Sequence, residues 1–268
     1  MTTHKQLETA LRAYYTRYYR DELGLPNWAA RVEMRLEEET VFAARLLDWI
    51  ESWINYSFDG KRVLVVGGGT GAESFAMIER GAEVVAIEPN EAAITILRMK
   101  ADLRQEKQNP GLMGIGEALP FRDGHFDLVF CYTVLEHTLD PERVVDEMIR
   151  VARVGGRIFI ETPDYRHFYE PHYKMTMPMF APKLLLRCWL RLKGRPGGFL
   201  RSLRFVTSRQ LRNMFQERPV TAMQVIHSWP RSWQTNPTTQ TRLTKWLTRT
   251  FGFQRDQYWL LQKLEKPR

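Results

Sequence analysis

Hydrophobic positions along the chain follow two different periods, and the change between them divides the sequence. Residues 3–55 carry apolar side chains at helical spacing, broken at 24–27, and therefore predict two helices. Beyond them, short β-branched runs alternate with helical segments. The pattern predicts strands at Arg62–Val66, Glu83–Glu88, Leu112–Ile115, Phe126–Tyr132 and Gly156–Thr162, and helices at Glu73–Glu79, Ala92–Gln105 and Pro141–Ala152. Such alternation is typical of a mostly parallel sheet covered by helices.

The alternation stops for about forty residues after Thr162 and then resumes. The last part of the chain predicts a helix near Thr207–Phe215, a strand near Thr221–Ile226, a helix near Leu243–Thr250 and a strand near Gln257–Leu264. We therefore predict an α/β protein in which residues 1–58 form a helical extension and residues 59–268 form the sheet domain. Residues 163–205 are expected to be an insertion in that domain.

Composition narrows the class of protein. Of 268 residues, 44% are apolar, which is ample for a packed core, and 26% are charged, which argues against wholesale disorder. The two cysteines, Cys131 and Cys188, are too few for a disulfide framework or a four-thiolate zinc site. The first twenty residues lack the apolar region of a signal peptide, and no apolar run reaches the ~18 residues of a spanning helix. We expect a cytoplasmic location, with a peripheral membrane contact as an option.

The net charge of +8 is concentrated in one segment. Residues 163–215 hold eleven Lys and Arg but two acids, so the rest of the chain sums to about −1. Within this segment, Pro182 and Gly194 bracket a predicted helix with Lys183, Arg187 and Arg191 on one face. This helix can be a lid over a pocket or can lie on an anionic membrane surface; nucleic acid is the least favoured partner.

A glycine-rich turn follows the first predicted strand. Residues 67–71 read GGGTG between a strand and a helix, and Glu88 closes the second strand. Glycines allow a ligand to approach bare backbone, and a carboxylate at that position can accept hydrogen bonds from ribose hydroxyls. The turn alone fits both nicotinamide dinucleotides and other adenosyl cofactors.

Two later segments distinguish these cofactors. Residues 116–127 read GEALPFRDGHFD, and LEHTLDP at 135–141 is followed by RVARVGG at 150–156. With the glycine turn and Glu88, they make residues 60–162 resemble class I S-adenosylmethionine-dependent methyltransferases, particularly those acting on quinones, sterols and other lipid-like molecules. The resemblance implies a Rossmann-like, seven-stranded, mostly parallel sheet. Its last strand is expected to be antiparallel, helices to cover both faces, and S-adenosylmethionine to be the cofactor.

The resemblance also implies roles for individual residues. The methionine and ribose side of the cofactor would be lined by Gly67, Gly69 and Gly71. Glu88, followed by Pro89, would hold the ribose hydroxyls, and Tyr132 would border the methionine end. Glu117 and Ala118 would lie on the loop that faces the adenine. Many relatives have an acid at the position of Ile115, so here Glu117 or backbone groups would contact the adenine amine.

Methyl transfer to a protonated nucleophile requires a base near the acceptor. His137 and His172 are the candidate catalytic bases, although His137 can equally shape its loop. Tyr169 and Tyr173 are candidates for contacting the substrate, the alternative being that they pack the lid. Glu136 is expected to be exposed or a local cap. The reaction itself needs no metal, and the sequence presents no convincing cluster of metal ligands.

The sequence therefore predicts methyl transfer to oxygen or carbon of a small, apolar or lipid-linked acceptor. The segment after the fourth strand, Cys131–Val134, lacks the Asn/Asp-Pro-Pro-aromatic motif of many nitrogen methyltransferases. Two alternatives remain open: a cofactor-binding module without transfer activity, and an RNA methyltransferase. A nicotinamide oxidoreductase is a more distant one.

Overall fold

The computed structural model describes residues 2–106, 109–225 and 255–265. The N-terminal segment forms α1 (His4–Thr16), a π-helical turn η1 (Arg17–Glu22) and α2 (Trp28–Ile54). Thr3 and Gln6 close a capping box at the start of α1, which satisfies amide groups that the first turn leaves free. The two helices and the break between them are confirmed, whereas the π-helical turn was not predicted.

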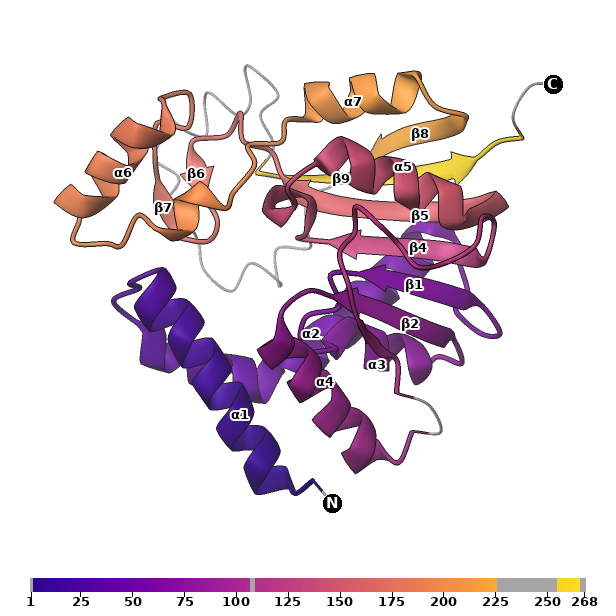
Figure 1. Ribbon diagram of the computed structural model, residues 1–268, viewed down its shortest axis with the longest axis horizontal. Coiled ribbons are helices and arrows are strands. Elements are labelled where there is room, and N and C mark those ends of the chain that lie inside the picture. The colour runs from indigo at the N-terminus through magenta and orange to yellow at the C-terminus, as the bar shows by residue number, and fades with distance from the viewer. Residues whose placement is uncertain (1, 107–108, 226–254, 266–268) are drawn as a thin grey trace.

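A seven-stranded sheet forms the centre of the molecule (Figure 1). In spatial order its strands are β3 (Gly111–Met113), β2 (Glu83–Glu88), β1 (Arg62–Val66), β4 (Phe126–Tyr132), β5 (Ala152–Pro163), β9 (Asp256–Lys263) and β8 (Val220–Val225). The first five are parallel, and β9 is antiparallel to both of its neighbours. The structure thus confirms the predicted sheet, including the antiparallel last strand between its neighbours.

Helices cover both faces of the sheet, because successive residues of each buried strand point to opposite sides. Val63 and Val65 of β1 pack with α2, with α3 (Ala72–Ile78) and with α4 (Glu91–Arg104). The intervening Leu64 and Val66 pack with α5 (Pro141–Val151) and with α7 (Ser208–Gln216). The predicted helix near Leu243–Thr250 lies outside the described residues.

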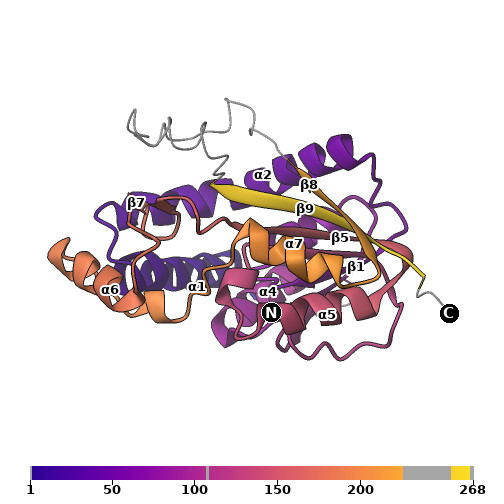
Figure 2. The same cartoon turned by 90° about the horizontal axis from the view of Figure 1, so that it is seen from above.

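The insertion builds a second region of the molecule together with the N-terminal helices. It contains β6 (Tyr169–Glu170), β7 (Met175–Thr176), α6 (Lys183–Leu192) and a short 3₁₀ helix η3 (Phe199–Arg201). These elements share a hydrophobic core with the N-terminal segment, formed by residues such as Leu11, Tyr19, Leu23, Tyr173, Leu186, Leu190 and Leu200. We call residues 4–32 and 165–203 the cap. Figures 1 and 2 show α1, α6 and the β6–β7 pair beyond the same end of the sheet.

Candidate functional site

The glycine turn between β1 and α3 has the open backbone that the sequence predicts. Gly67, Gly69 and Gly71 all have positive φ, which favours glycine. Beside Gly69, no described atom lies within 4 Å of the place where a Cβ would stand. At Gly67 a Cβ would lie only 2.2 Å from a methyl group of Val134. Gly69 therefore borders open space for a ligand, whereas Gly67 allows the loop after β4 to pack closely.

Glu88 closes β2 at the open side of this turn. Its Oε2 accepts the Gly69 N–H at 2.8 Å, and its Oε1 accepts the Asn90 N–H at 2.9 Å. Burial raises the pKa of Glu88, while the two N–H donors oppose the rise. Each carboxylate oxygen keeps capacity for a further hydrogen bond. Bare backbone at Gly69 and a carboxylate with free lone pairs fit the vicinal hydroxyls of a ribose, and Pro89 continues the same turn.

A cavity of about 720 Å³ lies between α1 with η1 on one side and Asn90 with the first turns of α4 on the other. It is lined by Tyr14 and Tyr18 on one side and by Asn90 on the other, among others. Burial and the charge of Glu88 raise the pKa of Tyr14 to about 12. The volume lies in the range of small-molecule sites. Asn90 both lines this cavity and donates its N–H to Glu88, so the cavity lies next to the turn that carries this carboxylate.

Tyr132 ends β4 at the same edge of the sheet. Its ring stacks on Phe130 with centroids 6.1 Å apart, and burial together with the nearby Glu161 raises its pKa well above the ordinary value. The next residue, Thr133, has φ +55°, and its N–H donates to both the carbonyl and Oε2 of Glu161. The sequence analysis missed Glu161. Its position as an acid at the end of the apolar run of β5 was the sequence feature that could have pointed to it.

The loop after β3 carries the residues predicted to face the adenine. Oε1 of Glu117 accepts the N–H groups of Leu139 at 2.8 Å and Asp140 at 3.3 Å. This carboxylate therefore ties its loop to the start of α5, while Ala118 is exposed. Contact of Glu117 and Ala118 with an adenine remains a prediction.

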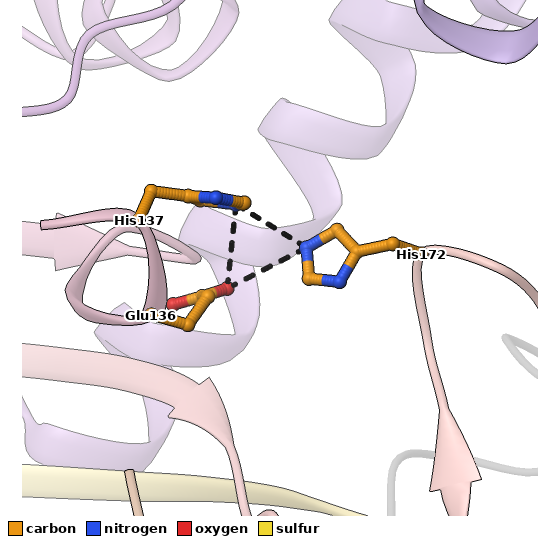
Figure 3. Close-up of side chains that lie close together, drawn as sticks. All are labelled: Glu136, His137 and His172. Atoms are coloured by element: carbon orange, nitrogen blue, oxygen red, sulfur yellow. Dashed lines mark hydrogen bonds and ion pairs between the residues drawn. The ribbon is translucent and has the colours of Figure 1, made fainter. Parts of the chain in front are cut away.

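The two candidate bases lie together, although thirty-five residues separate them. His137 ends the short helix η2 (Leu135–His137) after β4, and His172 lies between β6 and β7. Their Nε2 atoms are 3.2 Å apart, and Oε1 of Glu136 lies 3.9 Å from each (Figure 3). The structure thus gathers Glu136, His137 and His172 into one group, which we call the His–Glu cluster.

The environment of Glu136 differs from the one expected from the sequence, which was an exposed side chain or a local cap. The Glu136 side chain is fully buried, and its Oε2 accepts the Thr162 hydroxyl at 2.8 Å. Within the described part of the chain, its Oε1 has no hydrogen-bond partner. Leu135, which precedes Glu136, and Thr162, which donates to it, are also buried, so this carboxylate lies in the protein interior. Nothing in the sequence indicated this burial, because Glu136 is a charged residue that precedes His137 in a predicted loop.

Neighbouring charges set the protonation of the cluster. Burial raises the pKa of Glu136 to about 7, opposed by His172. For His172, burial favours the neutral ring, but Glu170 and Glu136 raise its pKa overall. Nδ1 of His172 lies 2.7 Å from Oε1 of Glu170, a fully buried carboxylate. Burial and the charge of His172 lower the pKa of His137.

Aromatic side chains connect the cluster to the cavity. The ring of Phe199 contacts His137 and His172, with centroid distances of 5.7 and 5.3 Å. Tyr18, which lines the cavity, packs edge-on against Phe199 at 5.7 Å. Two aromatic side chains, Phe199 and Tyr18, therefore lie between the cluster and the cavity.

The two tyrosines proposed to contact substrate have different environments. Tyr173 is fully buried in the cap core, and its hydroxyl donates to the Pro196 carbonyl at 2.9 Å. The side chain thus packs the cap, which is the alternative that the sequence left open, and its contact with substrate stays a prediction. Tyr169 is half-buried with Arg255 over its ring at 5.9 Å, and its contact with substrate stays a prediction.

Comparison with known proteins places this site in a family context. The family model for a methyltransferase domain matches residues 64–160. A ubiquinone biosynthesis O-methyltransferase of Pseudomonas fluorescens is 33% identical over 119 residues, which is 43% of this chain and 49% of that protein. The enzyme of the same name from Aromatoleum aromaticum is 34% identical over 141 residues, covering 53% and 59%. The chain thus spans about half the length of these relatives.

Solved structures share the fold at low sequence identity. The YcgJ protein from Bacillus subtilis has a TM-score of 0.56 at 16% identity, over 84% of this chain and 99% of that one. An S-adenosylmethionine-dependent methyltransferase from Mesorhizobium loti has a TM-score of 0.54 at 12% identity, over 78% and 93%. The family and the fold imply S-adenosylmethionine as the cofactor, which the turn and Glu88 fit. Residues 64–160 thus match a methyltransferase domain, and the strand order and the shared fold agree with that match.

Proposed function

We propose that this protein transfers a methyl group from S-adenosylmethionine to an oxygen or carbon atom of a small, apolar or lipid-linked acceptor. The observation that carries the proposal is the carboxylate of Glu88 at the open side of Gly69, beside a cavity of about 720 Å³. The relatives named as ubiquinone biosynthesis O-methyltransferases support an oxygen acceptor in a lipid-like molecule.

The residues of the chain would act mainly by positioning, which can supply much of the rate of a displacement reaction. S-adenosylmethionine, when bound, supplies an electrophilic methyl group. Glu88 would accept hydrogen bonds from the ribose hydroxyls, and Gly69 would let the cofactor approach the backbone. Tyr132, at the end of β4, would border the methionine end.

The cap would provide the acceptor side. Tyr18 and Phe199 present aromatic surface between the cavity and the His–Glu cluster, which suits an apolar acceptor. His137 is the more open member of the histidine pair, with a side chain 34% exposed against 10% for His172. We therefore assign His137 and His172 to the contact with the acceptor group that loses its proton.

The outer face of α6 would bring the protein to a membrane. Leu186 and Leu190 pack into the cap core, whereas Leu184 and Leu192 are 67% and 82% exposed. Exposed Arg191 and Lys193 lie at the end of the same helix, so apolar and cationic groups can meet an anionic lipid surface together. Among the described helices, none has the length and apolar character needed to cross a bilayer. A peripheral contact would give access to a lipid-linked acceptor.

Calorimetry with S-adenosylmethionine and S-adenosylhomocysteine tests the cofactor. We expect both to bind the full chain; absence of binding would refute the proposal. Incubation of cell extract with methyl-labelled cofactor then tests transfer, and the label is expected in the lipid fraction. Cofactor binding without any transfer would favour the binding-module alternative. Label in RNA, with binding that weakens steeply as salt rises, would favour an RNA methyltransferase.

Vesicle flotation tests the membrane contact. We expect the protein to float with vesicles that contain anionic lipid and to stay below with neutral ones. Leu192→Ser should weaken flotation, because it removes apolar area from the exposed face of α6. Leu264→Ser, at an exposed leucine just after β9, is the matched control and should float like the parent protein.

A further inference from the structure

We propose that the His–Glu cluster is a binding site for one divalent transition-metal ion of the zinc type, with Glu136, His137 and His172 as ligands. Each residue offers one atom to a common point, as Figure 3 shows. Two imidazole nitrogens and one carboxylate oxygen are a recurrent ligand set for such ions, and three protein ligands leave positions open.

The distances fit an ion of that size. Tetrahedral ligands at ~2.0–2.1 Å from zinc lie about 3.3 Å from one another. The two Nε2 atoms are 3.2 Å apart. Oε1 of Glu136 lies slightly beyond that separation, 3.9 Å from each nitrogen, so a small side-chain adjustment completes the site.

The orphan carboxylate oxygen is an independent sign of a ligand. Glu136 is fully buried, and while its Oε2 accepts the Thr162 hydroxyl, Oε1 has no hydrogen-bond partner among the described residues. A buried carboxylate oxygen without a partner is costly, and a cation removes that cost. The unpartnered atom is the one aimed at the two imidazoles, not at the protein interior.

A second layer holds the deepest ligand in the required orientation. Nδ1 of His172 lies 2.7 Å from Oε1 of Glu170, whose Oε2 accepts the Tyr173 N–H. A donated Nδ1–H fixes the tautomer that turns the Nε2 lone pair toward the cluster, which is the usual second layer of a metal-bound histidine. Phe199 packs against both rings and restricts their rotation.

The donor set selects the kind of ion. Imidazole nitrogen suits zinc and similar transition metals, whereas magnesium prefers an all-oxygen octahedral shell. The role of the ion, unlike the site itself, rests on the proposed function. The ion would hold and polarise an oxygen atom of the acceptor through its open coordination positions. The histidines would then act as ligands, and the acceptor proton would pass to solvent water.

Titration of chelator-treated full-length protein with zinc chloride, followed by calorimetry, tests the site. We expect one Zn²⁺ per chain and far weaker binding of Mg²⁺. His137→Gln and Glu136→Gln should abolish stoichiometric binding, and Glu170→Gln should weaken it by about 10- to 100-fold. His125→Gln, whose ring lies at the opposite end of β4, is the control and should bind Zn²⁺ like the parent protein. Circular dichroism establishes that each variant is folded. His137 has the most solvent-exposed side chain of the three ligands, so His137→Gln is the variant with the lowest risk of misfolding.

Substitution with Co²⁺ adds a readout of geometry, because nitrogen and oxygen ligands in a four- or five-coordinate site give visible absorption. Failure of the folded parent protein to bind Zn²⁺, or equal binding by His137→Gln, overturns the site. S-adenosylmethionine binding, measured on the same sample, separates the two proposals. If the cofactor binds and zinc does not, the metal site is overturned and the proposed cofactor site stands. If zinc binds and the cofactor does not, the proposed function is overturned and the metal site stands.

Discussion

The sheet and the cap are built in different ways. Most of each sheet layer comes from strands and helices that alternate along residues 43–160, with α7 and β9 added from later in the chain. The cap core instead joins α1 to residues more than 150 positions later, such as Leu186 and Leu200. Local periodicity therefore specifies the sheet, whereas the cap depends on contacts between distant segments.

The same division separates the two sides of the candidate site. The glycine turn and Glu88 belong to the sheet, and His172 and Phe199 belong to the cap. His137 stands at the boundary, since η2 directly follows β4. The proposed cofactor side thus lies in residues 64–160, which the family model matches, whereas His172 and Phe199 of the proposed acceptor side lie outside them.

The largest effect is expected where the sheet and the cap are tied together. Glu39 of α2 accepts hydrogen bonds from Lys100 and from the Tyr15 hydroxyl, both at 2.7 Å, and from Thr70 in the glycine turn. Glu39→Gln should lower the free energy of unfolding by about 3–5 kcal/mol, because it leaves the Lys100 ammonium buried without its counter-ion. Urea unfolding measures this.

A double variant sharpens the same prediction. Glu39→Leu combined with Lys100→Met removes both charges, and we expect it to be clearly more stable than Glu39→Gln. A Glu39→Gln protein as stable as the parent would mean that the ion pair does not hold the two regions together.

Within the cap, one helix offers a matched pair of leucines. Leu186→Ala should cost about 2–5 kcal/mol, because the side chain is fully buried in the shared core. Leu184→Ala, two residues earlier and exposed, should change the free energy of unfolding by less than about 0.5 kcal/mol. Hydrogen exchange should show the loss of protection in α1 as well as α6. Loss confined to α6 would contradict a shared core.

On the sheet side, binding and stability should separate at one residue. Glu88→Gln should reduce the affinity for S-adenosylmethionine by about 10- to 100-fold, the value of one or two hydrogen bonds to a charged group. Since burial raises the pKa of Glu88, ionisation opposes folding, and the variant should be as stable as the parent or more so. Calorimetry and thermal unfolding of the same samples check both statements; unchanged affinity would remove Glu88 from the site.

The smallest expected effect is a pH dependence of the stability that Glu39 contributes between the sheet and the cap. Burial favours neutral Glu39, but Lys100, Thr70 and Tyr15 lower its pKa below 4.5 overall. Its contribution is therefore present above pH ~4.5 and is lost as the pH falls through the lower value in the folded protein. The stability gap between the parent and Glu39→Gln should narrow only in that acidic range. A gap that narrows already between pH 8 and 6 would contradict this assignment.

The sequence predicted the sheet strands to within a few residues because strand and helix periods are local properties. It also predicted that Glu88 and the glycine turn lie close together, since the turn follows β1 and Glu88 ends the adjacent parallel strand β2. It did not reveal the His–Glu cluster: His137 and His172 are brought together by the path of β5 and the β6–β7 pair, and two-residue strands leave no periodic signal. The burial of Glu136 was not predicted because it depends on neighbours distant in sequence, such as Thr162.

The core shared by α1 and the insertion has a consequence for protein engineering. A chimera that received only residues 163–205 from a protein of the same fold would leave Leu11, Tyr19 and Leu23 facing foreign side chains. Replacing the insertion would therefore require exchanging the first thirty residues along with it, as a single graft made of two pieces.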